Sequence, residues 1–261
     1  MRRTLVKQHP TAIVSSKAEI GKDVAIGPFS VIEDDVVIGD GCFIDSGVSV
    51  KSGARIGANV KIYHGAAVAG QPQDLKFEGE KSELIVGDNT IIREFVTLNR
   101  GTRAHGKTEI GKNTLFMAYS HAAHDCIIGD NVILANSVQM GGHVEIGNWV
   151  IIGGGTVIHQ FSLIGEHAMI GGGFRITQDI LPYSSVAGYP LRCLGVNSIG
   201  LKRRDFSDET IAILKKLFRY LMSKKMNTSQ ALEKIEQEIE KIPEVVNVLN
   251  LLNKSERGVI K

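Results

Sequence analysis

An apolar residue, most often Ile or Val, recurs at every sixth position through about two-thirds of the chain. The series runs from Val14 to Ile176, and only Asp74, Glu80 and Ala104 interrupt it. A helix would repeat apolar residues at intervals of three and four, and a half-buried strand at intervals of two. A sustained period of six is the hexapeptide pattern of a parallel β-helix, in which each repeat forms one flat side of a coil.

A second register of small residues, four positions after each apolar residue, supports the same architecture. It begins at Ala18 and Val24 and includes two of the cysteines, Cys42 and Cys126, which we expect to be buried. Three sides of six residues make a triangular coil, so residues 18 apart stack in columns about 4.8 Å apart. The glycines that often follow the apolar residue suit corners with unusual dihedral angles. We therefore predict a mainly β fold.

The periodicity also divides the chain into two predicted domains. Residues 1–190 form the β-helix, interrupted by loop insertions near 69–85 and 99–109. Each insertion adds a multiple of six residues and so preserves the frame, and loops inserted in a rigid solenoid usually serve one working face. The repeat ends near Ile176, and residues 179–190 are predicted to be an exit loop.

Residues 191–261 have the pattern of a C-terminal helical domain. Ser207 is predicted to cap a helix whose first turn is acidic, and Thr228 to cap a second helix. Pro243 suits the first turn of a third helix that is rich in Val and Leu.

Composition and charge exclude several classes of protein. The chain of 261 residues has 3 cysteines without CxxC spacing, so neither a disulfide framework nor a zinc knuckle is indicated. No apolar run is long enough to span a membrane, which predicts a soluble cytoplasmic protein without a membrane span. Residues 192–261 hold 14 basic and 9 acidic side chains, whereas the preceding part is slightly acidic.

The basic excess leaves two interpretations open, a solvated helix face or a docking surface for an acidic partner. The sequence argues against nucleic acid as a partner, because the patch is small and has few interleaved aromatic residues. The basic residues are Lys202, Arg203, Arg204, Lys215, Lys216, Arg219, Lys224 and Lys225.

The column arithmetic brings chemically capable side chains together. His124, Gly142 and Gln160 are 18 residues apart and form one column, and Asp125 and His143 are neighbours in the next. A neutral imidazole that a carboxylate orients is a good general base near neutral pH. The Gly142 N–H could face an oxyanion, because glycine lets a carbonyl group approach closely.

The remaining histidines allow other interpretations. His121 is predicted one corner away from His124, whereas His9, His64, His105 and His167 are interpreted as surface residues of the coil. Metal binding is the main rival hypothesis, because trimeric γ-class carbonic anhydrases are hexapeptide β-helices that hold zinc with imidazoles. His121, His124 and His143 would be the ligands, but the adjacent Asp125 fits that arrangement less well. A non-catalytic β-helical scaffold would need neither the histidine cluster nor the two loops.

Six short motifs extend over the chain: QDLKF (73–77), IREFVTLNRGT (92–102), SHAAHDC (120–126), GGHV (141–144), HQF (159–161) and GLKRRDFS (200–207). Their sequences and order resemble the UDP-N-acetylglucosamine acyltransferase family, which opens lipid A biosynthesis. The resemblance implies a left-handed parallel β-helix, a homotrimer and transfer of a 3-hydroxyacyl chain from acyl carrier protein to the 3-position of UDP-N-acetylglucosamine. It implies no metal and no cofactor. Another hexapeptide acyltransferase remains an alternative.

The resemblance also implies roles for individual residues. His124 would be the general base, Asp125 would orient it, and the N–H of Gly142 would stabilise the oxyanion. The implied substrate-binding residues are Asp74, Lys76, His121, His143, His159, Gln160, Gly172, Asn197, Arg203 and Arg204. Arg203 and Arg204 would meet the nucleotide end, because guanidinium groups suit phosphate. The basic C-terminal surface would receive acyl carrier protein.

Four positions depart from the family pattern or carry its specificity. Ile199 replaces a common glutamate, which leaves a ribose contact undefined, and Pro190 lies where a histidine can border the acyl groove. Gly172 lies where some relatives have a bulky residue that shortens the acyl chain, so an open groove and a long chain are implied. Arg175 is charged where many relatives have a small residue.

Overall fold

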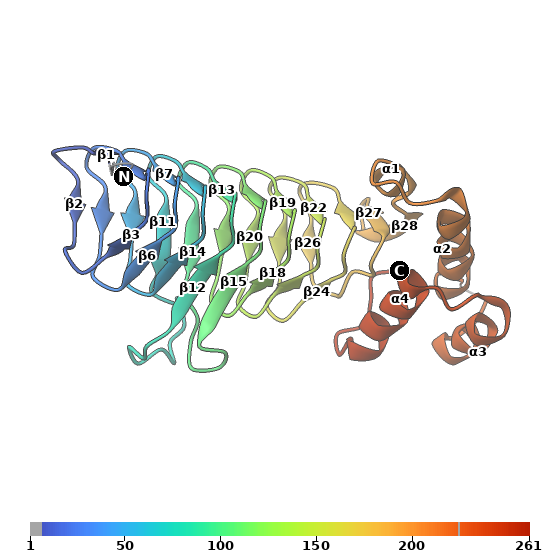
Figure 1. Ribbon diagram of the computed structural model, residues 1–261. Coiled ribbons are helices and arrows are strands. Elements are labelled where there is room, and N and C mark those ends of the chain that lie inside the picture. Colours follow the sequence, from blue (N-terminus) through green and yellow to red (C-terminus); the bar gives the residue numbers. More distant parts are fainter. Residues whose placement is uncertain (1–6, 224) are drawn as a thin grey trace.

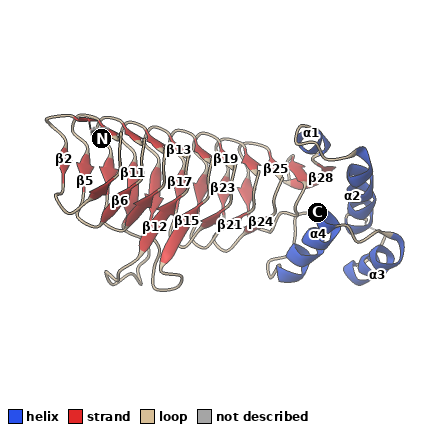
Figure 2. Ribbon diagram, in the orientation of Figure 1, coloured by secondary structure: helices blue, strands red, loops and turns tan. Residues whose placement is uncertain are grey.

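The chain forms a long three-sided coil of short strands followed by a cluster of helices (Figures 1 and 2). The structure is a computed structural model that describes residues 7–223 and 225–261. Lys224, which the sequence assigns to the basic surface, lies outside the described residues.

The three sides of the coil are three sheets, here named A, B and C. Sheet A contains β1 (Lys7–Gln8), β4 (Ala25–Ile26), β7 (Phe43–Ile44), β10 (Lys61–Ile62), β13 (Ile91–Ile92), β16 (Leu115–Phe116), β19 (Ile133–Leu134), β22 (Ile151–Ile152), β25 (Met169–Ile170), β27 (Ser184–Ala187) and β28 (Arg192–Val196). Sheet B contains β2 (Ile13–Val14), β5 (Val31–Ile32), β8 (Ser49–Val50), β11 (Ala67–Gly70), β14 (Thr97–Asn99), β17 (His121–Ala122), β20 (Gln139–Met140), β23 (Val157–Ile158) and β26 (Arg175–Ile176). Sheet C contains β3 (Glu19–Ile20), β6 (Val36–Ile38), β9 (Ala54–Ile56), β12 (Glu83–Val86), β15 (Lys107–Ile110), β18 (Ile127–Ile128), β21 (Glu145–Ile146) and β24 (Leu163–Ile164).

The predicted register is confirmed by the strand pairing. Ile133 pairs with Ile151, and Ile151 with Met169, so residues 18 apart are neighbours in adjacent parallel strands. The apolar residues of the six-residue frame and the small residues of the second register fill the interior, where Cys42 is 2% and Cys126 0% exposed. The coil therefore has a continuous apolar core, and neighbouring repeats bury each other's faces.

The glycines that follow the apolar residues are required for a different reason from the one predicted. Left-handed dihedrals occur elsewhere in the corners, and these glycines are needed because adjacent coils approach closely. A Cβ atom on Gly129 would lie 2.4 Å from the side-chain oxygen of Asn148, and one on Gly111 would lie 2.5 Å from the backbone of Gly129. Close stacking of the corners, rather than dihedral strain, excludes side chains at these positions.

The two insertions leave the coil as loops on one side (Figure 1). They are shorter than predicted, covering 71–82 and 100–106, because the flanking residues pair within sheets B and C. Lys61 pairs with Ile91 and Lys107 with Glu83, so the frame is displaced by whole repeats and the core stays in register. All three interruptions of the apolar series lie in these loops.

Residues after Ile176 differ in part from the predicted exit loop. The segment 184–187 continues sheet A as β27, and β28 pairs with it in the antiparallel direction. Four helices follow within the described residues: α1 (Ser198–Lys202), α2 (Asp208–Leu221), α3 (Thr228–Glu238) and α4 (Pro243–Lys254). The first of them was not predicted. Among these residues, no helix is long and apolar enough to cross a membrane.

Two of the three predicted helix starts are confirmed. The side chain of Ser207 accepts a hydrogen bond from Thr210 at the start of α2, and Pro243 occupies the first turn of α4. Asn227, rather than Thr228, caps α3, in a reciprocal arrangement with Gln230. A capping box of this kind satisfies two otherwise unpaired N–H groups.

The helices have their own apolar core, which includes Leu214 of α2 and Val245 of α4. Two residues that precede position 190, Leu181 and Tyr183, belong to this core, whereas Ile260 belongs to the core of the coil. The division at 190/191 therefore stays a prediction.

Candidate active site

The predicted cluster of polar side chains lies at the corner between sheets B and C. Asp125, His143 and Phe161 occupy equivalent corner positions in consecutive coils, with φ angles of 59°, 60° and 63°. Such left-handed dihedrals are uncommon outside glycine, and here they recur at each corner. Equivalent backbone positions project their side chains in register, so the rings of His143 and Phe161 stack with centroids 4.5 Å apart.

His124 and Asp125 form a hydrogen-bonded pair. The Nδ1 atom of His124 lies 2.8 Å from Oδ2 of Asp125. An ionised carboxylate only accepts hydrogen bonds, so Nδ1 carries the proton and the neutral imidazole keeps a lone pair on Nε2. The pair therefore presents Nε2 as a base.

The side chain of Asp125 is held in place by Thr102 of the second loop. This side chain is fully buried and accepts hydrogen bonds from the N–H of Thr102, at 2.9 Å, and from the Thr102 hydroxyl, at 2.7 Å. Burial alone would raise the pKa of Asp125, but the bonds from Thr102 and His124 outweigh it and hold the pKa below its usual value. Thr102 was not predicted, because its contact with Asp125 depends on the path of the loop.

His143 lies between two other imidazoles. Its ring meets those of His124 and His105 edge to face, each with centroids 5.2 Å apart. Burial lowers the pKa of His143, and although Asp125 opposes the shift, His124 and His105 add to it. His105 is exposed, as interpreted, but it lies in the second loop rather than on a coil, and this loop brings its ring against His143.

Gly142 is buried under the imidazole of His124. A Cβ atom at this position would lie 2.6 Å from Cε1 of His124, so the ring occupies the space that a side chain would take. Among the described residues, the N–H of Gly142 donates no backbone or side-chain hydrogen bond within the chain. Glycine here makes room for the base beside a free N–H group.

The other residues predicted near the sugar lie around this cluster at different distances. Asp74, in the first loop, is close enough to oppose the lowering of the His143 pKa, and Lys76 is exposed on the same loop. His121 projects from β17 and its Nδ1 lies 2.8 Å from the hydroxyl of Thr97. His159 and Gln160 lie one coil beyond His143, and Gln160 packs on Gly141.

Three predicted residues flank α1, away from this cluster. Asn197 caps α1 and donates to the carbonyl of His167, so its amide is already engaged. Arg204 stacks over Trp149, with its guanidinium carbon 5.1 Å from the ring centroid, and burial lowers its pKa. Arg203 is exposed at the end of α1.

Gly172 lies at the corner between sheets A and B. It is exposed, but a Cβ atom here would lie 2.8 Å from the carbonyl oxygen of Gly154 in the preceding coil. A larger residue would therefore have to shift the corner as well as occupy the space outside it.

His167 is not a surface residue, contrary to the sequence interpretation. It is 8% exposed and packs among Trp149, Tyr183 and Phe206. Burial lowers its pKa, opposed by Glu166. Its column position gave no signal of this, because the covering residues come from the C-terminal part of the chain.

Among the residues that the structure describes, one compact set of side chains could hold a metal ion. His124, Asp125 and His143 each offer a donor atom, and these atoms lie within 4.8 Å of one another. The predicted rival set is different, because it has His121 in place of Asp125. His121 is engaged with Thr97, and Nδ1 of His124 is engaged with Asp125.

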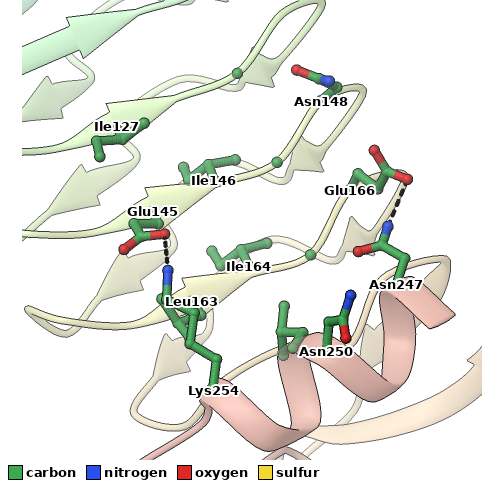
Figure 3. Close-up of a pocket in the computed structure, with 14 residues that line it drawn as sticks. Ile127, Glu145, Ile146, Asn148, Leu163, Ile164, Glu166, Asn247, Asn250 and Lys254 are labelled. Atoms are coloured by element: carbon green, nitrogen blue, oxygen red, sulfur yellow. Dashed lines mark hydrogen bonds and ion pairs between the residues drawn. The ribbon is translucent and has the colours of Figure 1, made fainter.

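A separate groove of about 370 Å³ lies between sheet C and α4 (Figure 3). Its apolar wall includes Ile146 and Ile164, and Lys254 contacts Glu145 across it. Neither His124 nor its partners line this groove, so we assign it to docking of α4 on the coil.

The fold and the site define a hexapeptide-repeat transferase. A family model described as bacterial transferase hexapeptide matches residues 17–52, 35–70 and 107–142, and one described as Udp N-acetylglucosamine O-acyltransferase, domain 2, matches residues 179–260. The acyl-[acyl-carrier-protein]–UDP-N-acetylglucosamine O-acyltransferase of Trichlorobacter lovleyi is 52% identical over 97% of this chain and 98% of the relative. The corresponding protein of Chlorobaculum parvum is 50% identical over 96% of this chain and 95% of the relative.

Solved structures agree with these relatives. The UDP-N-acetylglucosamine acyltransferase of Bacteroides fragilis has a TM-score of 0.94 at 42% identity, covering 97% of this chain and 99% of that one. The Acinetobacter baumannii protein has a TM-score of 0.93 at 40% identity, and the match covers 97% of this chain and 99% of that one. The chain belongs to the UDP-N-acetylglucosamine acyltransferase family, and its coil is a left-handed parallel β-helix.

Proposed function

We propose that this chain transfers a 3-hydroxyacyl group from acyl carrier protein to the 3-hydroxyl of UDP-N-acetylglucosamine, the first step of lipid A biosynthesis, in the cytoplasm. Membership of the family supports this activity. The observation that carries the chemistry is the pair in which Asp125 holds Nδ1 of His124 at 2.8 Å and leaves Nε2 as a base.

The proposed mechanism uses this base in both halves of the transfer. Nε2 of His124 takes the proton of the sugar hydroxyl as the oxygen attacks the thioester carbonyl. Asp125 stabilises the imidazolium that forms, and the N–H of Gly142 donates to the oxyanion of the tetrahedral intermediate. The intermediate then expels the thiolate, which receives the proton from His124. Acyl transfer needs no metal in this scheme.

We further propose that the enzyme is a homotrimer. The outer face of sheet A carries an apolar stripe that would be covered in such an assembly, consisting of Ile91, Leu115, Ile133, Ile151 and Met169. If sheet A of one subunit packs against sheet B of the next, the corner between these sheets faces the three-fold axis. The corner that carries His124 then lies beside the next subunit's corner between sheets C and A.

This arrangement accounts for the scattered positions of the predicted substrate residues. Arg204 and Asn197 lie near Trp149, at the corner between sheets C and A. In the proposed trimer they would reach the nucleotide bound at His124 of a neighbouring subunit, where Arg203 would also contact phosphate. The sugar would contact Asp74, Lys76, His121 and His143 of the first subunit.

The same arrangement gives the acyl chain a path. A chain bound at His124 would run along the seam between sheets A and B toward the corner of Gly172. The exposed glycine leaves that end open, which supports a long acyl group. The exposed basic residues of α2 would receive the acidic carrier protein.

The test is an acyl-transfer assay of the purified protein. It uses UDP-N-acetylglucosamine and its 3-amino analogue as acceptors, and a series of 3-hydroxyacyl carrier proteins as donors. We expect ester formation with the 3-hydroxyl sugar and a loss of about 10²–10⁴-fold in His124→Ala. His64→Ala, an exposed coil histidine, is the matched control. Transfer only to the 3-amine, or activity of His124→Ala within a few-fold of the parent, would contradict the proposal.

A chelator arm separates this mechanism from the zinc hypothesis. Turnover that is unchanged by a chelator and by added zinc supports general-base catalysis. Turnover that a chelator abolishes and zinc restores would transfer the chemistry to a metal held by His124, Asp125 and His143.

A further inference from the structure

The segment after α4 returns to the coil and is fixed there. The N–H of Asp179 donates to the carbonyl of Gly258, and the N–H of Ile260 donates to the carbonyl of Asp179, both at 2.9 Å. The hydroxyl of Ser255 donates to the buried carboxylate of Asp179 at 2.6 Å. At the other end, contacts of α4 with the coil fix where the segment begins (Figure 3).

This docking places Arg257 against a residue of the proposed substrate site. Nη2 of Arg257 lies 2.7 Å from Nδ1 of His159. The guanidinium is half-buried, its Nε atom is buried without a hydrogen-bond partner, and no carboxylate of the described residues pairs with it. Arg257 also lines a cavity of about 430 Å³ together with His143 and His105.

The ring nitrogen of His159 has two neighbours with opposite requirements. Nδ1 lies 2.9 Å from the carbonyl oxygen of Gln160, which can only accept a hydrogen bond, and 2.7 Å from Arg257, which can only donate one. A protonated Nδ1 satisfies the carbonyl and opposes the guanidinium, whereas an unprotonated Nδ1 does the reverse. Arginine keeps its proton under all ordinary conditions, so the guanidinium favours the tautomer with the lone pair on Nδ1.

We propose that Arg257 is a positioning residue that selects the His159 tautomer with its proton on Nε2. His159 then presents a hydrogen-bond donor, rather than an acceptor, to the substrate. The matching group on the substrate is a carbonyl or phosphate oxygen. This inference rests on the proposed function, in which His159 lines the substrate site.

The direct test is the tautomer of His159, measured by long-range ¹H–¹⁵N correlation spectra of the full chain with ¹⁵N-labelled histidine. His159→Ala identifies the signals. We expect the proton on Nε2 in the parent protein and in Arg257→Lys, and on Nδ1 in Arg257→Met, where the Gln160 carbonyl is the remaining partner. Arg192→Met, at an exposed arginine of β28, should leave the spectrum unchanged. If the spectra of the parent protein show the proton of His159 on Nδ1, the proposal is overturned, whatever the variants show.

Kinetics test whether the tautomer matters for binding. Loss of one hydrogen bond to substrate lowers kcat/KM about tenfold. We expect this decrease in Arg257→Met, mainly through KM, and partial recovery in Arg257→Lys. The double variant with His159→Ala should be no worse than His159→Ala alone, because both changes remove the same donor.

Additive losses in the double variant, or a tautomer that is the same with and without Arg257, would show that Arg257 acts only by holding the segment in place. Failure of the proposed function is distinguishable, because the spectra report the tautomer even if the parent protein does not transfer an acyl group.

Discussion

The coil and the helical part of the chain are held together in different ways. Each strand of the coil pairs with strands one coil before and after it, so the same contacts recur along sheets A, B and C. The helical core instead joins residues that are far apart in sequence, such as Leu181, Leu214 and Val248, each in a contact that occurs once. Repeated contacts can be deduced from a period, whereas unique contacts cannot.

The candidate site lies where the regular coil meets an irregular loop. His124, Asp125 and His143 are set by the coil corners, but Thr102 reaches Asp125, and His105 reaches His143, from a loop that leaves the coil. The regular corner supplies alignment of the side chains, and the irregular loop supplies the hydrogen bonds that fix the ionisation of Asp125. Four experiments, from the largest expected effect to the smallest, separate these contributions.

Thr102→Val should lower kcat about 10- to 100-fold. The change keeps the shape of the side chain but removes the hydroxyl that donates to Asp125 at 2.7 Å, and hydrogen bonds to charged groups contribute about 1.5–3 kcal/mol. Steady-state kinetics and a melting curve measure activity and stability together. The control is Thr156→Val, a buried coil threonine bonded to the carbonyl of Gly171. Equal loss of activity in both variants would show that the loop has no special role.

Tyr183→Phe should lower the free energy of unfolding by about 1–3 kcal/mol, because a buried polar contact is lost. The Tyr183 hydroxyl donates to Glu166 at 2.5 Å and accepts from Asn247, so it joins the coil to α4. Denaturant unfolding followed by the helical circular dichroism signal measures the change. Tyr119→Phe, at a 57% exposed tyrosine of the coil, should have no effect. A Tyr183 variant as stable as the parent would mean that apolar packing alone holds α4.

Acid should destabilise the fold through His167. Burial lowers the pKa of this imidazole in the folded chain, so the unfolded chain binds the proton at higher pH. The contribution of neutral His167 to the free energy of unfolding is therefore fully present above the unfolded pKa of about 6.5. It is lost as the pH falls below that value. Melting temperatures from about pH 7.5 to about pH 5.5 should decrease less in His167→Phe than in the parent. The exposed His64→Phe is the matched control. An unchanged slope in His167→Phe would remove His167 as the cause.

Reversing charges on α2 should raise the KM for acyl carrier protein several-fold and flatten its salt dependence. Lys215 and Arg219 are exposed, whereas Lys216 already donates to the carbonyl of Glu238, so the variant is Lys215→Glu with Arg219→Glu. The control reverses Lys7 and Lys22, two exposed lysines at the other end of the coil. If both double variants change KM equally, the effect is net charge rather than a docking surface.

The sequence predicted much of the fold and the centre of the site. The period of six placed the interior residues, the three sides and the two loops, and the spacing of 18 brought His124, Asp125, Gly142 and His143 together. These predictions succeed because a coil of constant length converts sequence distance directly into spatial distance. The roles of all the predicted site residues stay predictions, and Asn197, Arg203, Arg204 and Gly172 lie away from His124 within this chain.

Only the tertiary structure decided the contacts that no period describes. The path of residues 100–106 brought Thr102 to Asp125 and His105 to His143, and the return of residues 255–260 brought Arg257 to His159. The same is true of His167, which the C-terminal part buries. A local repeat determines which residues stack, because each coil repeats the geometry of the last. Loop paths and helix docking depend on the summed free energy of many single contacts. No periodicity in the sequence indicates which residues make those contacts.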